Sequence, residues 1–165
     1  MAKKIIIYQT GGSYFPFPEE IKNYDYLITH RGAVLKGSNE KDIYKPFRKE
    51  INIAFMGMKG YESYKKQGDF PITAVQLDEG LKFIANLAVE FDIKPSTTSI
   101  LTSYEQKKRK YGIVNIAETD IVSLPTQAYL FPDEVGKYLR SKVKFYIKYG
   151  LDNDNENKNE EKCIS

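Results

Sequence analysis

The most constraining stretch of this sequence is Thr73–Phe91, which carries the signature of an amphipathic helix. Thr73 and Gln76 form a T-x-x-Q pair, in which each side chain can accept a hydrogen bond from a backbone N–H of the first turn. Apolar residues then recur at helical spacing: Ala74, Leu77, Leu81, Ile84, Ala88 and Phe91. The spacing predicts a helix over 74–91 that Pro95 prevents from continuing, and its apolar face must pack against other elements.

Short apolar runs bounded by turn residues predict strands before and after this helix. They lie at 4–9, 24–29, 33–35, 50–58 and 98–102, and Gly32 indicates a hairpin between the second and the third. A second helix is expected over 132–149, beginning at Pro132. Because strands and helices mix without strict alternation, the sequence predicts an α/β (α+β) domain, with a central mixed sheet of about five strands flanked by helices.

The last residues differ in composition from the rest of the chain. Residues 150–165 carry five acidic side chains against two lysines, a net charge of −3, and since the whole chain carries +3, residues 1–149 carry +6. A segment this polar has little apolar surface to bury. Burial therefore cannot compensate for the conformational entropy that the segment would lose on becoming ordered. We therefore expect one folded domain over 1–149 and a disordered acidic tail over 150–165.

The chain has one histidine, His30, and one cysteine, Cys163, which excludes much common active-site chemistry. A single cysteine forms no internal disulfide. Cysteine–histidine and Ser–His–Asp sites would both have to recruit His30, which falls in the expected hairpin turn, where a solvated or locally bonded side chain is the favoured interpretation. No phosphate-binding glycine loop is present, and no motif supports a paired-carboxylate glycosidase.

Targeting signals are also absent from the sequence. The first residues lack the apolar run of roughly 7–15 residues that a signal peptide needs. No segment approaches the ~20 apolar residues of a membrane span. We expect synthesis in the cytoplasm and no membrane partner.

Several segments, in order, resemble the N-acetylmuramoyl-L-alanine amidase family, which includes amidase-type phage lysozymes and peptidoglycan recognition proteins. Residues 24–37 (YDYLITHRGAVLKG) resemble its Y-H-Y-x-I-x-R-D-G hairpin. Residues 51–57 (INIAFMG), followed by 68–70 (GDF), resemble its central strand and loop. Residues 73–91 resemble its T-x-x-Q helix, and 100–105 (ILTSYE) stand where the family has I-x-G-H-x-[ED]. The resemblance spans roughly residues 4–140 and implies an amidase-like fold.

Family members hold a catalytic zinc with two histidines and a third ligand that is Cys, His or Asp. In this sequence Tyr8 or Gln9 stands at the first histidine position and Ser103 at the second, while Asp120 matches an Asp-type third ligand. A single carboxylate does not hold a zinc ion. Shifting the alignment cannot supply the two missing histidines, because the chain has only one. The resemblance therefore implies a pseudoenzyme with no metal, no cofactor and no catalytic residue.

The former substrate groove is the expected ligand site, lined by Tyr8, Gln9, Tyr24, Ser103 and Asp120. Tyr24 matches a tyrosine that assists catalysis in phage members, although without metal a wall or core position is the favoured interpretation. Glu118 stands where that subgroup carries a catalytic lysine, a reversal of charge.

A run of four basic residues lies near this groove in the expected fold: Lys107, Lys108, Arg109 and Lys110. It is either a contact patch for an anionic polymer or a solvated loop. We expect a basic loop over 107–112 and irregular chain over 113–124, and nucleic acid is the less favoured partner.

Three functions remain open at this point. The first is a catalytically inactive amidase-like domain that serves as a phage-type structural or virion-associated assembly module, with other virion proteins as partners. The second is a metal-free protein that binds peptidoglycan fragments, or muropeptides. The third, least favoured, is a live peptidoglycan amidase or another enzyme with an unrecognised site.

Overall fold

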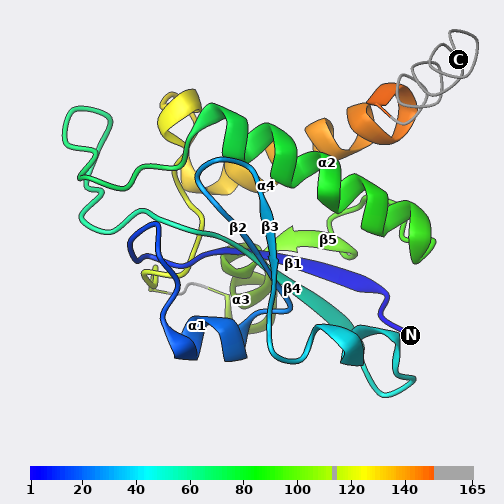
Figure 1. Ribbon diagram of the computed structural model, residues 1–165. Helices are drawn as coiled ribbons and strands as arrows, with labels where there is room; N and C mark the ends of the chain where they lie inside the picture. The colour runs from blue at the N-terminus through cyan, green and yellow to red at the C-terminus, as the bar shows by residue number, and fades with distance from the viewer. Residues whose placement is uncertain (113–114, 151–165) are drawn as a thin grey trace, which may run out of the picture.

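Five strands form the mixed sheet expected from the sequence (Figure 1). In the computed structural model, which describes residues 1–112 and 115–150, they are β1 (Lys4–Gln9), β2 (Tyr26–Ile28), β3 (Val34–Lys36), β4 (Glu50–Phe55) and β5 (Ile100–Thr102). Their order is β3-β2-β4-β1-β5. All neighbours pair in parallel except β2 and β3, which form the expected antiparallel hairpin. The expected α/β fold class is confirmed.

Helices cover both faces of the sheet. The α-helices are α1 (Pro18–Asn23), α2 (Ala74–Glu90), α3 (Ser103–Tyr111) and α4 (Pro132–Phe145); short helical turns are η1 (Glu40–Tyr44), η2 (Pro125–Gln127) and η3 (Tyr146–Gly150). Figure 1 shows α2 and α4 on one side of the sheet and α1 and α3 on the other. None of the helices in the described ranges combines the length and apolarity that crossing a membrane requires.

The capping pair that predicts α2 is present. Thr73 Oγ1 accepts from Gln76 N and Gln76 Oε1 accepts from Thr73 N, both at 3.1 Å. Gln76 is fully buried, and its Nε2 also donates to the carbonyl oxygens of Ile28 and Met56, at 2.9 and 2.8 Å. The cap therefore fastens α2 to the ends of β2 and β4, where the first turn of the helix meets the sheet.

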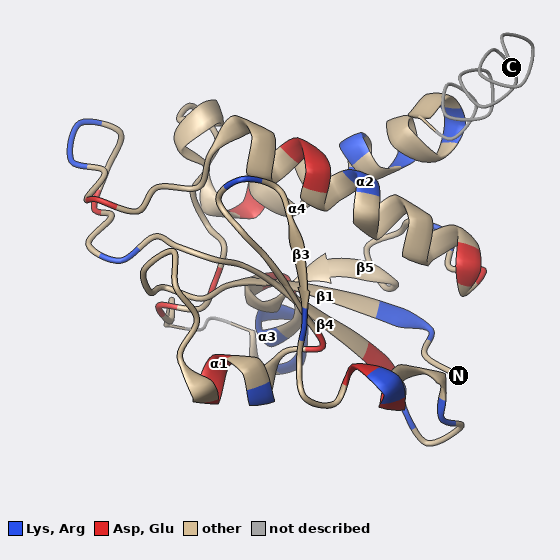
Figure 2. Ribbon diagram, viewed as in Figure 1, with Lys and Arg blue, Asp and Glu red and all other residues tan. Residues whose placement is uncertain are grey.

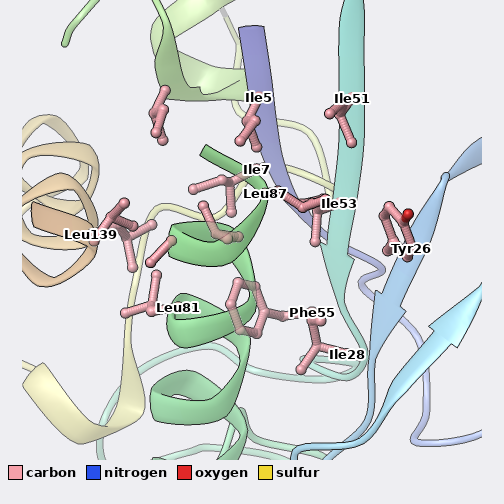
Figure 3. Packing of buried hydrophobic residues seen from close by; sticks show 14 of the residues in the cluster. Ile5, Ile7, Tyr26, Ile28, Ile51, Ile53, Phe55, Leu81, Leu87 and Leu139 are labelled. Atoms are coloured by element: carbon pink, nitrogen blue, oxygen red, sulfur yellow. The ribbon is translucent and has the colours of Figure 1, made fainter. Parts of the chain in front are cut away.

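The main core lies between the sheet and the layer of α2 and α4 (Figure 3). Ile5, Ile7, Ile53 and Phe55 project from β1 and β4 and pack against α2 and α4. Each is fully buried or nearly so, and each contributes roughly 1.5–3 kcal/mol by leaving water. Gly80 brings α2 close to β4, because a Cβ at this position would lie 2.4 Å from Phe55 Cε1.

The expected basic loop over 107–112 is wrong. Residues 103–111 form α3, which begins with the same capping signature as α2: Thr102 Oγ1 accepts from Glu105 N at 3.1 Å, and Glu105 Oε1 accepts from Thr102 N at 3.0 Å. The helix carries almost no apolar residues, so hydrophobic periodicity does not reveal it. The six-residue α1 was missed for the same reason, since none of its residues is buried.

Arg140 of α4 covers the outer edge of β5. Its Nη1 donates to the carbonyl oxygen of Ile100 at 3.2 Å and to both carboxylate oxygens of Glu105, at 2.9 and 3.0 Å. Arg140 is only 8% exposed. A buried guanidinium with a carboxylate and a backbone carbonyl as acceptors is well satisfied. This side chain joins α4, α3 and the edge of the sheet.

The remaining expectations concern the ends of elements. The second long helix begins at Pro132, as predicted, and changes at Tyr146 from α-helix to the wider turn of η3. Of the acidic tail expected over 150–165, only Gly150 is described, as the last residue of η3; the rest lies outside the described residues.

Candidate functional site

The topology brings the carboxyl ends of three parallel strands to one edge of the sheet. β1 lies between β4 and β5, and the chain leaves β1 through α1 toward one side of the sheet and later adds β5 on the other side. In open α/β sheets, ligands bind in the crevice outside the carboxyl ends of the strands, where the order of strands changes direction. Residues that directly follow β1, β4 and β5 are therefore the natural site residues.

A cleft of about 620 Å³ lies at this edge and is partly open to solvent. One wall consists of Gln9, Gly11 and Gly12 after β1, a second of residues 58–62 after β4, and a third of residues from 116 to 123. Phe17, at the start of α1, completes the lining. Two of the predicted groove residues, Gln9 and Asp120, belong to this lining.

Asp120 is the most heavily bonded side chain of the site. It is 1% exposed, and its Oδ1 accepts from Ser103 Oγ at 2.6 Å. Its Oδ2 accepts from Ala117 N at 2.8 Å and from the ammonium of Lys107. The carboxylate thus ties the third wall of the cleft to the first turns of α3, and every bond it accepts comes from a strong donor.

Gln9 ties the same wall to the end of β1. Its backbone N donates to Thr119 O at 3.1 Å, and its Nε2 donates to Glu118 O at 2.9 Å. The side chain is 9% exposed, and its buried Oε1 has no hydrogen-bond partner among the described residues. A buried acceptor without a donor costs about 1–3 kcal/mol, so a donor placed here would gain free energy.

Gly11 allows the third wall of the cleft, residues 116–123, to approach the end of β1 closely. Its φ is +70°, and a Cβ at this position would lie 2.7 Å from Glu118 O. Any side chain at position 11 would therefore strain the backbone and push residue 118 away from β1.

Tyr8 and Tyr24 do not line the cleft. They belong to a second cluster on the α1 side of the sheet, with Leu27, Ala54 and Met56, and their ring centroids lie 5.2 Å apart. Burial raises the pKa of Tyr8, and burial chiefly, with a smaller effect of Tyr8 and nearby carboxylates, raises the pKa of Tyr24 to about 12. Both phenols are therefore held in the neutral form.

Figure 2 shows Lys and Arg residues in blue on α3. Their side chains have different partners, so the run of basic residues does not form one patch. Lys107 binds Asp120, and Lys108 Nζ lies 2.6 Å from Asp133 Oδ1 on α4. Arg109 Nη1 donates to Thr97 O at 2.8 Å, and Lys110 lies over the ring of Tyr111. Two of the four positive charges are paired with carboxylates. The helix therefore attracts an anionic polymer less strongly than four unpaired charges would.

His30 lies in the hairpin turn, as expected, and away from Ser103 and Asp120. Its ring stacks on Tyr14 with centroids 4.2 Å apart, and its carbonyl oxygen accepts from Thr73 Oγ1 at 2.5 Å. Tyr14 in turn donates to Pro71 O at 2.5 Å. These contacts fasten the hairpin to the chain before α2, which is a structural role.

The residues at the expected zinc position do not fit a zinc ion. Gln9 offers an amide, Ser103 a hydroxyl, and Asp120 a carboxylate that already accepts from an ammonium. Protein zinc sites use imidazole, thiolate and free carboxylate ligands. Throughout residues 1–112 and 115–150, His, Cys, Asp and Glu side chains nowhere gather in threes close enough to hold a metal.

The same residues are poorly arranged for metal-free catalysis. Ser103 is 5% exposed and donates its proton to Asp120, so its oxygen is neither accessible nor beside an imidazole. The side chain of Lys107 is engaged in an ion pair with Asp120 and does not line the cleft. What the site offers is a cleft whose third wall is tied to β1 and α3 by hydrogen bonds. The motifs gave no sign of the lining residues 58–62, and Lys107, which was expected in a basic contact patch, instead binds Asp120 beside the cleft.

Comparison with known protein families and with curated proteins finds no match for this sequence. The amidase resemblance therefore rests on the order of motifs in the chain.

Proposed function

We propose that this protein is a catalytically inactive amidase-like domain that acts by binding, and that its cleft takes a peptide-bearing fragment of peptidoglycan. The observation that carries the proposal is the cleft of about 620 Å³ at the carboxyl ends of β1 and β4. The three positions that align with the family's zinc ligands, Gln9, Ser103 and Asp120, gather beside this cleft.

The lining of the cleft suits a peptide. Gly11, Gly12 and Gly60 lie along its walls and leave room for a ligand backbone to approach. Phe17 is 57% exposed and Ile116 53% exposed, which places apolar surface where a ligand side chain or a sugar ring can pack. The lining combines this apolar surface with polar and charged side chains such as Gln9, Lys59 and Glu62, and small-ligand sites use both kinds of surface.

The test is direct binding of a soluble muramoyl peptide, measured by isothermal titration calorimetry with and without a strong chelator. We expect saturable binding that the chelator leaves unchanged, with no release of the peptide from the sugar. Cleavage of the amide bond, or binding that the chelator abolishes, would show that the domain is an enzyme or metal-dependent. No binding to the peptide or to purified sacculi at low salt would refute the proposal.

An assembly role in a phage-type particle is the second candidate, and a group of exposed aromatic residues near the end of α4 favours it. Phe145 and Tyr149 are 52% and 48% exposed, and their rings lie 5.1 Å apart. Exposed aromatics are enriched in protein interfaces. Its test is whether the protein is present at fixed stoichiometry in purified particles of a phage whose genome encodes this chain. Absence from the particles would exclude this role.

A further inference from the structure

Asp120 is an acidic side chain that the fold buries. It lies at the junction of α3 and residues 115–123 and is almost fully buried. A buried carboxylate is very unfavourable unless a positive charge and hydrogen bonds compensate it. In a metal site, the cation would provide that charge.

Lys107 provides the charge here. It lies four residues after Ser103 on α3, so both side chains project from one face of the helix toward Asp120. The Lys107 ammonium binds Asp120 Oδ2 and also approaches Asn115 O at 3.3 Å. A lysine has three N–H donors and can therefore bridge several oxygens, as a small cation does.

We propose that the Lys107 ammonium takes the place of a metal ion in this site. It supplies the positive charge that holds Asp120, and with it the third wall of the cleft, against the start of α3. The lysine both removes the need for a cation and blocks one from binding, because its ammonium already lies against the carboxylate. Lys107 plays this part in building the site whatever ligand the cleft takes.

The first experiment measures the role of Lys107 in stability. Lys107→Met leaves a buried carboxylate without its charge partner, and we expect the Tm to fall by about 5–10 °C. Lys108→Met is the matched control, since it breaks a solvent-exposed pair on the same helix; its Tm should change by no more than about 2 °C. In Lys107→Met/Asp120→Asn no charge remains buried, and much of the lost Tm should return. Equal Tm losses in the two single variants would overturn the proposal.

The second experiment tests whether Lys107 occupies the place of a cation. Gln9→His and Ser103→His together add two imidazoles beside Asp120. We compare this double variant with the triple variant that also carries Lys107→Met, using Co²⁺ as a probe whose visible absorption reports tetrahedral ligation. The triple variant should bind Co²⁺ at least tenfold more tightly than the double variant. Equal affinity in the two, or no binding in the folded triple variant, would refute the proposal.

The Tm and Co²⁺ experiments on Lys107 can be interpreted whether or not the cleft binds a muramoyl peptide. Folding of each variant is checked by circular dichroism and thermal unfolding before Co²⁺ is added. The binding function is tested on the unmodified chain with a muramoyl peptide. If that peptide does not bind, the Co²⁺ comparison still decides the role of Lys107; if the Co²⁺ comparison fails, the peptide measurement is unaffected.

Discussion

The Ser103 hydroxyl donates a 2.6 Å hydrogen bond to Asp120 Oδ1, joining the first turn of α3 to a segment 17 residues further along the chain. Both side chains are buried, so water cannot replace either partner without opening the structure. The contact closes a loop that includes the described residues 115–120 and fixes one wall of the cleft. Its removal should therefore affect both stability and the shape of the site.

Ser103→Ala should lower the free energy of unfolding by about 1–3 kcal/mol, because it removes a buried hydrogen bond to a charged acceptor. Urea denaturation measures the change. Ser141→Ala is the control: its hydroxyl donates to Lys137 O at 2.9 Å on an exposed face of α4, and we expect a change within about 0.5 kcal/mol. Equal losses in the two variants would mean that the buried Ser103–Asp120 hydrogen bond contributes no more to stability than the exposed bond of Ser141.

Gly136→Ala should destabilise the protein by about 2–4 kcal/mol, although alanine is the better helix former by about 1 kcal/mol. A Cβ at position 136 would lie 1.8 Å from Glu105 Oε1, and this carboxylate is held by Arg140 and Thr102 N. Either the ion pair breaks or α4 moves away from α3. Thermal unfolding measures the loss, and Lys137→Ala, at the next and exposed position, should be almost neutral.

The clash can be confirmed by a double-mutant cycle. In a Glu105→Ala background the carboxylate is gone, so Gly136→Ala should cost much less there than in the natural sequence. If the two substitutions are additive, the close approach of Glu105 to Gly136 is not the cause of the loss.

Phe17→Ala should weaken binding of a muramoyl peptide by about tenfold, since Phe17 contributes exposed apolar surface to the cleft. Phe131→Ala is closely matched, because Phe131 is also an exposed residue before a helix that begins with proline, and its N–H likewise donates to a glutamate three residues later at 2.8 Å. Phe131 does not line the cleft, so the affinity should be unchanged in that variant. Calorimetry compares the three proteins.

Tyr24 should keep its proton well into the alkaline range. Its pKa is raised from 10.0 to about 12, chiefly by burial, so the folded protein binds this proton more tightly than the unfolded chain does. The associated stability is fully present below pH 10 and is lost as the pH rises from 10 through 12. Tyr24→Phe should therefore lose less stability over this interval than the natural protein. Urea denaturation at pH 9, 10 and 11 checks the slopes, and parallel slopes would contradict the assignment.

The two capping boxes show what sequence patterns can and cannot reveal. Thr73 and Gln76 are followed by a stripe of apolar residues, so the helix that they begin was predicted almost to its last residue. Thr102 and Glu105 form the same kind of box, but the residues after them are polar and basic. This helix, α3, was missed because contacts of Glu105 and Lys107 with other elements hold it in position, and a buried apolar face does not.

Some residues of the site could likewise be predicted from the sequence, and others could not. Motif order placed Gln9, Ser103 and Asp120 near one another, and the described residues bring them together around one wall of a cleft. Tyr24 was assigned to the groove as well, yet it packs in the α1-side cluster with Tyr8. Lys107 could be paired with Asp120 only once α3 was known to be a helix, because helical spacing alone places its side chain beside Ser103.

Arg140 has a consequence for how this domain can meet other copies or partners. By donating to Ile100 O it occupies an outward-facing carbonyl at one border of the sheet, where a foreign strand would have to form its backbone bonds. The opposite border is β3, with only three residues and Lys36 at its end. Such borders resist strand-by-strand growth into fibres. Any assembly that includes this domain is therefore expected to use side-chain surfaces and not to extend the sheet from one copy to the next.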